Sequence, residues 1–188
     1  PVAVPAKIEN EFRITPDELE EHVTPKTKVL LIGYPNNPTG AIMTRKDLLA
    51  IAAFAEKHDL IVISDEIYGD LTYGGEKHVC FSSLPGMQER TILLNGFSKA
   101  YAMTGWRIGY ALGNKAFISA MTKIHQYTML CAPITAQIAA IEALRHGEKY
   151  MKKMVAEYDR RRHLIYDGFT KMGLPCFEPK GAFYIFPD

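Results

Sequence analysis

Two short apolar runs on either side of an amphipathic segment limit most strongly what this chain can fold into. Residues 29–34 (VLLIGY) and 60–64 (LIVIS) are almost continuously apolar, which is typical of strands buried on both faces of a sheet. Between them come the turn residues 35–40 (PNNPTG), then Thr44 with Asp47 three residues on, a near-match to the capping box, and then apolar residues at helical spacing. The order strand, helix, strand predicts a βαβ unit with two parallel strands.

The same pattern continues along the chain and predicts an α/β fold. Two further strands are expected over residues 91–95 (TILLN) and 108–112 (IGYAL). The helices that we expect cover residues 115–130, from Pro133 to about His146, and a long charged stretch over 148–172. A domain boundary is expected near Gly147, and a strand of a second unit over 182–186.

Composition excludes several classes of protein. Lys and Arg number 22 and Asp and Glu 21, so the net charge of +1 does not favour a nucleic-acid surface. No apolar run approaches the ~20 residues of a membrane span, and no signal peptide opens the sequence. The three cysteines are far apart, which favours unpaired thiols in a reducing compartment. Because the chain starts without Met and stops just after an apolar run, we expect a piece of a longer protein.

Polar side chains gather where the predicted strands end. They are Asn36 and Asn37 after the first strand, Asp65, Glu66 and Tyr68 after the second, Ser98 and Lys99 after the third, and Arg107 just before the fourth. Taken singly, each has an ordinary structural explanation, such as an Asx turn, a helix cap or a solvated lysine. Ligands of open α/β sheets bind at the carboxyl ends of the strands, so the combination favours a functional site there.

Competing motifs are missing from the sequence. There is no P-loop, no GxGxxG after a strand and no GxSxG elbow. The six histidines show no metal-ligand spacing, so we expect no metal site. The basic run at 160–162 lies in a predicted helix, where its side chains fan around the axis, and it favours a solvated face or intramolecular salt bridges.

An amine, a carboxylate and an arginine at one sheet edge can bind three different groups of a single cofactor. A lysine amine forms an imine with an aldehyde, a carboxylate keeps a pyridine nitrogen protonated, and an arginine binds a phosphate. The cofactor that carries an aldehyde, a pyridine and a phosphate is pyridoxal 5′-phosphate (PLP).

At these residues the sequence resembles the PLP-dependent class I/II aminotransferases of fold type I. The resemblance is carried by YPNNPTG (34–40), SDEIY (64–68), GFSKAYAMTGWRIGY (96–110) and PKGAFYIFPD (179–188). The segments at 125–133 and 157–162 are similar to the branch of aromatic, aspartate and acetyl-diaminopimelate aminotransferases. The resemblance implies a three-layer αβα PLP-binding large domain with a mostly parallel sheet, of which residues 1–147 are the central and C-terminal part. It implies a connecting long helix and the start of a small α+β domain over residues 148–188. It also implies a cytoplasmic homodimer.

The resemblance assigns roles to four residues around the cofactor ring. Lys99 matches the lysine that holds PLP as an internal aldimine and, once freed, moves the proton between the substrate Cα and the cofactor C4′. Asp65 matches the carboxylate that faces the pyridine nitrogen. Tyr68 and Asn37 match the residues that hydrogen-bond the 3′ oxygen of the ring.

Two further residues match the phosphate site, and one position departs from the family pattern. Arg107 matches the phosphate-binding arginine and Ser98 a hydroxyl near that phosphate. Many family members have a serine where this chain has Gly96, so one phosphate hydroxyl of the family pattern is lost here. By resemblance, the second phosphate loop and the aromatic residue that stacks on the ring should precede Pro1, and the arginine that binds the substrate carboxylate should follow Asp188.

The function implied is transfer of an amino group from an L-amino acid to a 2-oxo acid by a ping-pong mechanism through Lys99. Two alternatives stay open at this stage. One is another PLP reaction on the same fold, such as a C–S β-lyase. The other is an aminotransferase-like domain that senses a ligand in a transcription regulator. No membrane partner and no nucleic-acid contact by this segment are expected.

Overall fold

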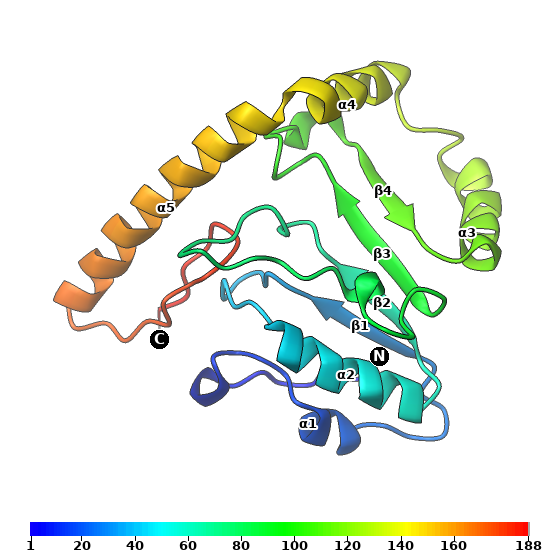
Figure 1. The fold of residues 1–188 in the computed structure, drawn as a ribbon, viewed down its shortest axis with the longest axis horizontal. Helices are drawn as coiled ribbons and strands as arrows, with labels where there is room; N and C mark the ends of the chain where they lie inside the picture. Colours follow the sequence, from blue (N-terminus) through cyan, green and yellow to red (C-terminus); the bar gives the residue numbers. More distant parts are fainter. Residues whose placement is uncertain (188) are drawn as a thin grey trace.

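A four-stranded sheet forms the centre of the protein in a computed structural model that describes residues 1–187 (Figure 1). Its strands are β1 (Val29–Gly33), β2 (Ile61–Asp65), β3 (Thr91–Gly96) and β4 (Gly109–Leu112), in that spatial order. The first three are parallel and β4 runs antiparallel to β3. The predicted α/β class and the mostly parallel sheet are therefore confirmed.

Because β4 runs antiparallel to β3, it begins at the edge of the sheet where β3 ends. Gly96, the last residue of β3, lies opposite Gly109, the first residue of β4. The chain turns back between these residues through a loop that contains a short 3-10 turn, Thr104–Trp106. As a result, the start of β4 lies at the same edge of the sheet as the carboxyl end of β3, and Arg107 reaches that edge.

Helix α2 (Arg45–Lys57) covers one face of the sheet, and its N-terminus has the expected cap. Thr44 Oγ1 accepts a hydrogen bond from the Asp47 N–H at 3.3 Å, and an Asp47 carboxylate oxygen accepts one from the Thr44 N–H at 2.8 Å. The buried apolar side chains of the helix pack against the sheet residues Ile32 and Val62. Each large apolar side chain buried in this way stabilises the fold by about 1.5–3 kcal/mol.

A short helix that we did not predict, α1 (Pro16–Glu20), lies beside α2. It begins with a second capping box, in which the Thr15 hydroxyl accepts from the Glu18 N–H and the Glu18 carboxylate accepts from the Thr15 N–H. A threonine followed by proline and then glutamate is a helix-start signal, so this helix could have been found from the sequence.

The three remaining helices match the expected ones within a few residues. They are α3 (Lys115–Thr128), α4 (Ile134–His146) and α5 (Glu148–Lys171). Along α5, Arg160 and Arg161 pair with Glu157, and Arg162 pairs with Asp159 and Glu178, so the predicted intramolecular ion pairs are confirmed. Within residues 1–187, none of the helices combines the length and the apolar character that crossing a bilayer requires.

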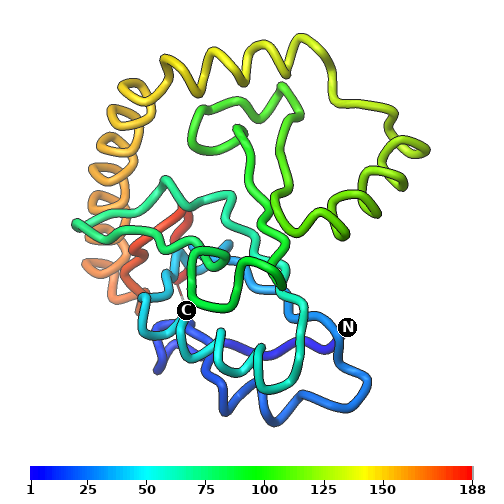
Figure 2. The backbone as a smooth tube through the Cα atoms, turned by 45° about the vertical axis from the view of Figure 1, so that its right-hand side comes forward, coloured from blue at the N-terminus to red at the C-terminus, as the bar shows by residue number. Residues whose placement is uncertain are grey.

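The prediction of a strand over residues 182–186 is wrong. In the described part of the chain this region forms only isolated bridges, Thr72 with Gly181 and Cys176 with Pro187. Ala182 has a left-handed backbone (φ 55°), which interrupts an extended strand, and its N–H donates to the Leu71 carbonyl at 2.9 Å. Residues 179–187, which we call the C-terminal segment, therefore run beside the loops that leave β1 and β2 rather than in a ladder (Figure 2).

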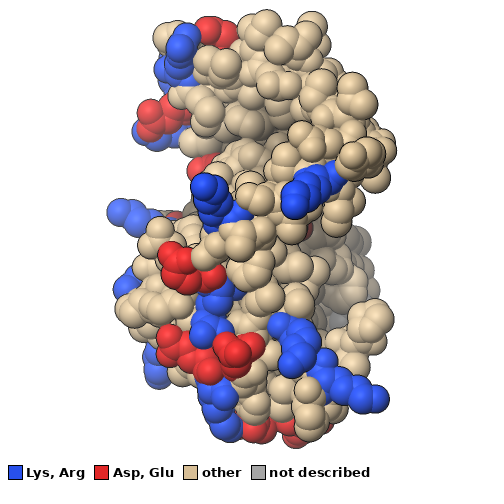
Figure 3. Space-filling model, turned by 90° about the vertical axis from the view of Figure 1, so that its right-hand side faces the viewer, with Lys and Arg blue, Asp and Glu red and all other residues tan. Residues whose placement is uncertain are grey.

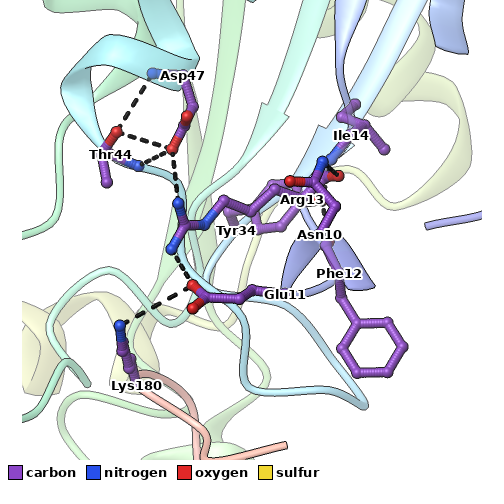
Figure 4. A network of polar contacts seen from close by, with 9 residues as sticks. All are labelled: Asn10, Glu11, Phe12, Arg13, Ile14, Tyr34, Thr44, Asp47 and Lys180. Carbon is purple, nitrogen blue, oxygen red and sulfur yellow. Dashed lines mark hydrogen bonds and ion pairs between the residues drawn. The ribbon is translucent and has the colours of Figure 1, made fainter. Parts of the chain in front are cut away.

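The beginning of the chain is tied to α2 and to the C-terminal segment by a network around Arg13 (Figure 4). The Arg13 guanidinium pairs with Glu11 and, at 3.5 Å, with Asp47 at the start of α2. Glu11 also lies 3.9 Å from the Lys180 Nζ. Nearby, the Tyr34 hydroxyl donates to the Phe12 carbonyl at 2.7 Å. These contacts join parts of the chain that are far apart in sequence.

Candidate active site

Asp65 occupies the centre of the edge where β1, β2 and β3 end. It is the last residue of β2 and lies opposite Gly33 of β1 and Leu94 of β3. Its Oδ1 accepts a hydrogen bond from the Ile67 N–H at 3.1 Å, which orients the half-buried carboxylate at the strand end. The predicted position of this carboxylate, at the carboxyl edge of the parallel strands, is confirmed.

Tyr68 lies next to Asp65 and is buried, with 6% of its surface exposed. Its hydroxyl is 2.6 Å from the hydroxyl of Tyr184. Burial raises the pKa of Tyr68, and the hydrogen bond to Tyr184 and the charge of Asp65 raise it further, whereas a hydrogen bond from Asn37 acts to lower it. Asn37, Asp65 and Tyr68 thus act on one another at the same edge of the sheet.

Lys99 follows β3 and brings its amine to this group. The Lys99 Nζ lies 5.6 Å from the centre of the Tyr68 ring and 5.4 Å from the centre of the Phe183 ring. An ammonium group at this distance from an aromatic face is attracted by the ring quadrupole. The two rings therefore hold a half-buried amine beside the Tyr68 phenol.

Arg107 and Ser98 lie at the same edge and are connected through Thr104. The Arg107 Nη1 donates to the Thr104 carbonyl at 2.8 Å, and the Thr104 hydroxyl donates to the Ser98 carbonyl at 3.0 Å. Arg107 is exposed and takes part in no ion pair within residues 1–187. A guanidinium that uses one nitrogen in a hydrogen bond and makes no ion pair with the described residues suits a bound anion such as a phosphate.

Gly96 has a structural reason to be glycine. A Cβ added to Gly96 would lie 2.9 Å from the Cα of Gly109 and 3.1 Å from the Ile108 carbonyl oxygen. Contacts this short with backbone require the strands to shift. The close approach of β3 and β4 therefore excludes the serine that many members of the resembled family carry here.

Two of the polar residues at the strand ends lie outside the site. The Asn36 side chain donates to the Gly33 carbonyl at 3.2 Å and accepts from the Thr39 hydroxyl at 3.0 Å, so it stabilises the turn. The Glu66 side chain turns to the other side of β2, where Ser64, His78 and Phe81 bind it. Neighbouring residues on a strand point to opposite faces, which explains why Asp65 and Glu66 separate.

Sequence reasoning missed two residues of the site, Phe183 and Tyr184. The Phe183 ring contacts the Tyr68 ring edge to face, with centroids 5.5 Å apart. Both residues belong to the PKGAFYIFPD stretch, which signalled the family but not a role. Their place beside Lys99 depends on how the C-terminal segment packs on the rest of the fold, and no local pattern encodes that packing.

The side chains at this edge fit the cofactor that the sequence suggests. An amine (Lys99), a carboxylate (Asp65), a phenol (Tyr68) and an amide (Asn37) lie at the same edge of the sheet, together with a guanidinium (Arg107) that makes no ion pair within residues 1–187. This donor set matches an aldehyde, a pyridine nitrogen, a ring oxygen and a phosphate. A comparable donor set for a metal is not found within residues 1–187, which hold no group of three or more His, Cys, Asp or Glu side chains arranged as ligands.

The chain is similar over its whole length to known aminotransferases. An aromatic-amino-acid aminotransferase of Thermococcus litoralis is 50% identical over all of this chain and 49% of its own length. An aspartate aminotransferase of Pyrococcus abyssi is 51% identical, again over the whole chain and 49% of its own length. The crystal structure of an aromatic aminotransferase from Pyrococcus horikoshii superposes with a TM-score of 0.97 at 50% identity, over 100% of this chain and 51% of that one.

The chain spans about half the length of the curated relatives that it matches. A family model described as aminotransferase class I and II matches residues 1–188. Since that match covers the whole sequence and the fold and the side chains at the sheet edge agree with it, the chain belongs to the class I and II aminotransferase family.

Proposed function

We propose that this chain forms the cofactor-binding half of a PLP-dependent aminotransferase, which moves an amino group from an L-amino acid to a 2-oxo acid. The observation that carries the proposal is the position of the Lys99 amine, beside both the Tyr68 and the Phe183 ring at the edge where Asp65 ends β2. The names of the similar proteins, aromatic-amino-acid and aspartate aminotransferases, support it.

PLP, when bound, supplies an aldehyde carbon for the amino nitrogen and a ring that accepts the electron pair of the substrate α-carbon. Lys99 would be the amine that holds this aldehyde carbon, and it would take and return the proton at the substrate α-carbon. Asp65 would keep a proton on the ring nitrogen by charge pairing. Tyr68 and Asn37 would donate hydrogen bonds to the ring oxygen, and Arg107 and Ser98 would hold the phosphate.

The test is covalent trapping of the cofactor in the full-length polypeptide that contains these residues. After PLP addition and borohydride reduction, peptide mapping should place the pyridoxyl group on Lys99. Lys99→Ala should abolish the adduct and the visible band of the bound cofactor, whereas Lys123→Ala, on the exposed α3, should leave both unchanged. An adduct that persists in Lys99→Ala contradicts the assignment.

Product analysis separates amino transfer from lyase chemistry on the same cofactor. Mixing the PLP-loaded protein with aspartate or an aromatic amino acid should convert the cofactor to pyridoxamine phosphate and release the 2-oxo acid. The names of the relatives are the reason for choosing these two donors. Release of ammonia and pyruvate from a cysteine-type substrate, without pyridoxamine phosphate, would contradict the proposal.

We also propose that the protein is a cytoplasmic homodimer. Helices α3 and α4 expose a set of large apolar side chains, namely Met121, Ile124, Tyr127, Ile134, Ile138, Ile141 and Leu144. The upper right of the face in Figure 3 shows no Lys, Arg, Asp or Glu side chain. An exposed apolar surface of this extent favours association. The three free thiols support a reducing compartment. Sedimentation analysis and cell fractionation test the two parts of the proposal.

A further inference from the structure

Tyr68 and Tyr184 are 116 positions apart in sequence, yet their hydroxyl oxygens lie 2.6 Å apart. This is the distance of a strong O–H···O hydrogen bond. The two rings meet edge to face, with centroids 5.6 Å apart and an interplanar angle of 77°. The pair joins a residue of the cofactor site to a residue of the C-terminal segment.

The backbone, and not only the side chain, determines where Tyr184 lies. The Gly40 carbonyl accepts hydrogen bonds from the Lys180 N–H at 3.0 Å and the Gly181 N–H at 2.9 Å. The two segments approach so closely that a Cβ on Gly40 would lie 2.3 Å from the Pro179 Cβ. Tyr73 also donates its hydroxyl proton to the Ala182 carbonyl. The C-terminal segment is therefore docked tightly on the loops that carry Asn37 and Tyr68.

Counting protons determines which phenol must donate when the site is loaded. Each phenol has one O–H proton, and its oxygen can accept further hydrogen bonds. The proposed function uses the Tyr68 proton for the ring oxygen of PLP, so that proton is no longer available for Tyr184. The 2.6 Å contact is then a hydrogen bond only if the Tyr184 hydroxyl donates to the Tyr68 oxygen.

We propose that Tyr184 is a positioning residue, whose hydroxyl donates to the Tyr68 oxygen and so directs the Tyr68 proton toward the ring oxygen of bound PLP. A phenol that accepts a hydrogen bond on its oxygen becomes a stronger donor through its own O–H, because consecutive hydrogen bonds polarise one another. Tyr184 thus acts on the cofactor only through Tyr68. This inference rests on the proposed function.

The first test is the pH titration of the visible band of PLP bound to the full-length protein. A stronger donor at the ring oxygen stabilises its negative charge, and this lowers the pH midpoint of the band. Tyr184→Phe should therefore raise the midpoint by about half a pH unit or more. Tyr158→Phe is the matched control, because its ring packs 5.5 Å from the Phe183 ring and its hydroxyl makes no hydrogen bond within residues 1–187. The control should leave the midpoint unchanged.

The second test asks whether the effect passes through Tyr68. In a Tyr68→Phe background, Tyr184→Phe should no longer move the midpoint, since the group that transmits the effect is absent. Replacing Tyr184 by 3-fluorotyrosine, which keeps the ring and the hydroxyl but is a stronger donor, should lower the midpoint. The opposite signs of the two changes at Tyr184 cannot arise from a general loss of packing.

The outcomes separate the inference from the proposed function. An unchanged or lowered midpoint in Tyr184→Phe overturns the inference, and so does a shift of equal size with and without the Tyr68 hydroxyl. Failure of the unaltered full-length protein to form a borohydride-reducible adduct on Lys99 overturns the proposed function itself.

Discussion

The carboxylate of Glu66 and the imidazole of His78 lie 2.5 Å apart, and the Glu66 side chain is only 3% exposed. The Ser64 hydroxyl and the Phe81 N–H each donate to the other carboxylate oxygen at 2.9 Å. A buried carboxylate with three donors is stable only while those partners remain in place. The pair holds the loop of residues 78–81 against β2, directly behind the strand end that carries Asp65.

Glu66 should make the protein sensitive to acid. Burial alone would raise the pKa of Glu66, but the hydrogen bonds from His78, Phe81 and Ser64 outweigh burial and hold it below its usual value of 4.5. A lowered folded-state pKa contributes stability that is complete above the unfolded-state value and is lost as pH falls through the folded-state value. Unfolding free energy should therefore decrease below about pH 4.5.

Glu66→Gln tests this relationship in urea unfolding experiments. The variant should lose about 1–3 kcal/mol of unfolding free energy at neutral pH, because the amide leaves a donor without a partner. Its loss of stability in acid should also be smaller than that of the unaltered protein. The control is Glu9→Gln, at an exposed position. An unfolding free energy of Glu66→Gln equal to that of the control at neutral pH contradicts the prediction.

Asp65 should matter more for turnover than for binding. A carboxylate that keeps the ring nitrogen protonated acts where negative charge develops during the reaction, so Asp65→Asn should lower kcat by about 10²- to 10³-fold. The affinity for PLP should change much less, since phosphate contacts remain. Steady-state kinetics and a PLP binding titration on the same preparation measure both. Asp70→Asn, at an exposed position nearby, serves as the control. Near-normal kcat in Asp65→Asn would count against the role.

Arg107 should matter mainly for holding the phosphate. Arg107→Ala removes charge-assisted hydrogen bonds and should raise the Kd for PLP about 10- to 100-fold. Arg107→Lys keeps the charge but loses the planar fork, so its Kd should lie between that of the unaltered protein and that of Arg107→Ala. Arg145→Ala, on the exposed side of α4, should bind PLP normally. If the Kd of Arg107→Ala equals that of Arg145→Ala, the phosphate assignment is wrong.

Gly96→Ser should destabilise the protein rather than add a phosphate contact. The new Cβ lies 2.9 Å from the Gly109 Cα, and overpacking of this kind costs about 1–3 kcal/mol. Gly105→Ser is the control, because a Cβ there meets nothing within 4 Å. Thermal unfolding should show a lower Tm for the first variant only. Tighter PLP binding by Gly96→Ser at an unchanged Tm would disprove the steric explanation.

Local patterns in the sequence were sufficient for most of the elements and for the residues of the site that follow strands. The capping box at Thr44 forms as its spacing predicts, because its hydrogen bonds join residues only three positions apart. Asp65 and Lys99 reach the same edge because parallel strands end together there. The sequence places Glu66 next to Asp65 at the strand end, but the alternation of side chains along a strand directs the two carboxylates to opposite faces of the sheet.

The sequence by itself determined the strand–helix–strand unit, the family and the side chains available for chemistry, because these depend on contacts within a few residues. Only the tertiary structure decided that β4 runs antiparallel, which brings Arg107 to the site, and that the C-terminal segment docks on Gly40 instead of forming a strand. That docking places Tyr184 on Tyr68. The docking is made by backbone hydrogen bonds between distant segments and by their close approach at Gly40, and short-range sequence patterns do not encode such pairings.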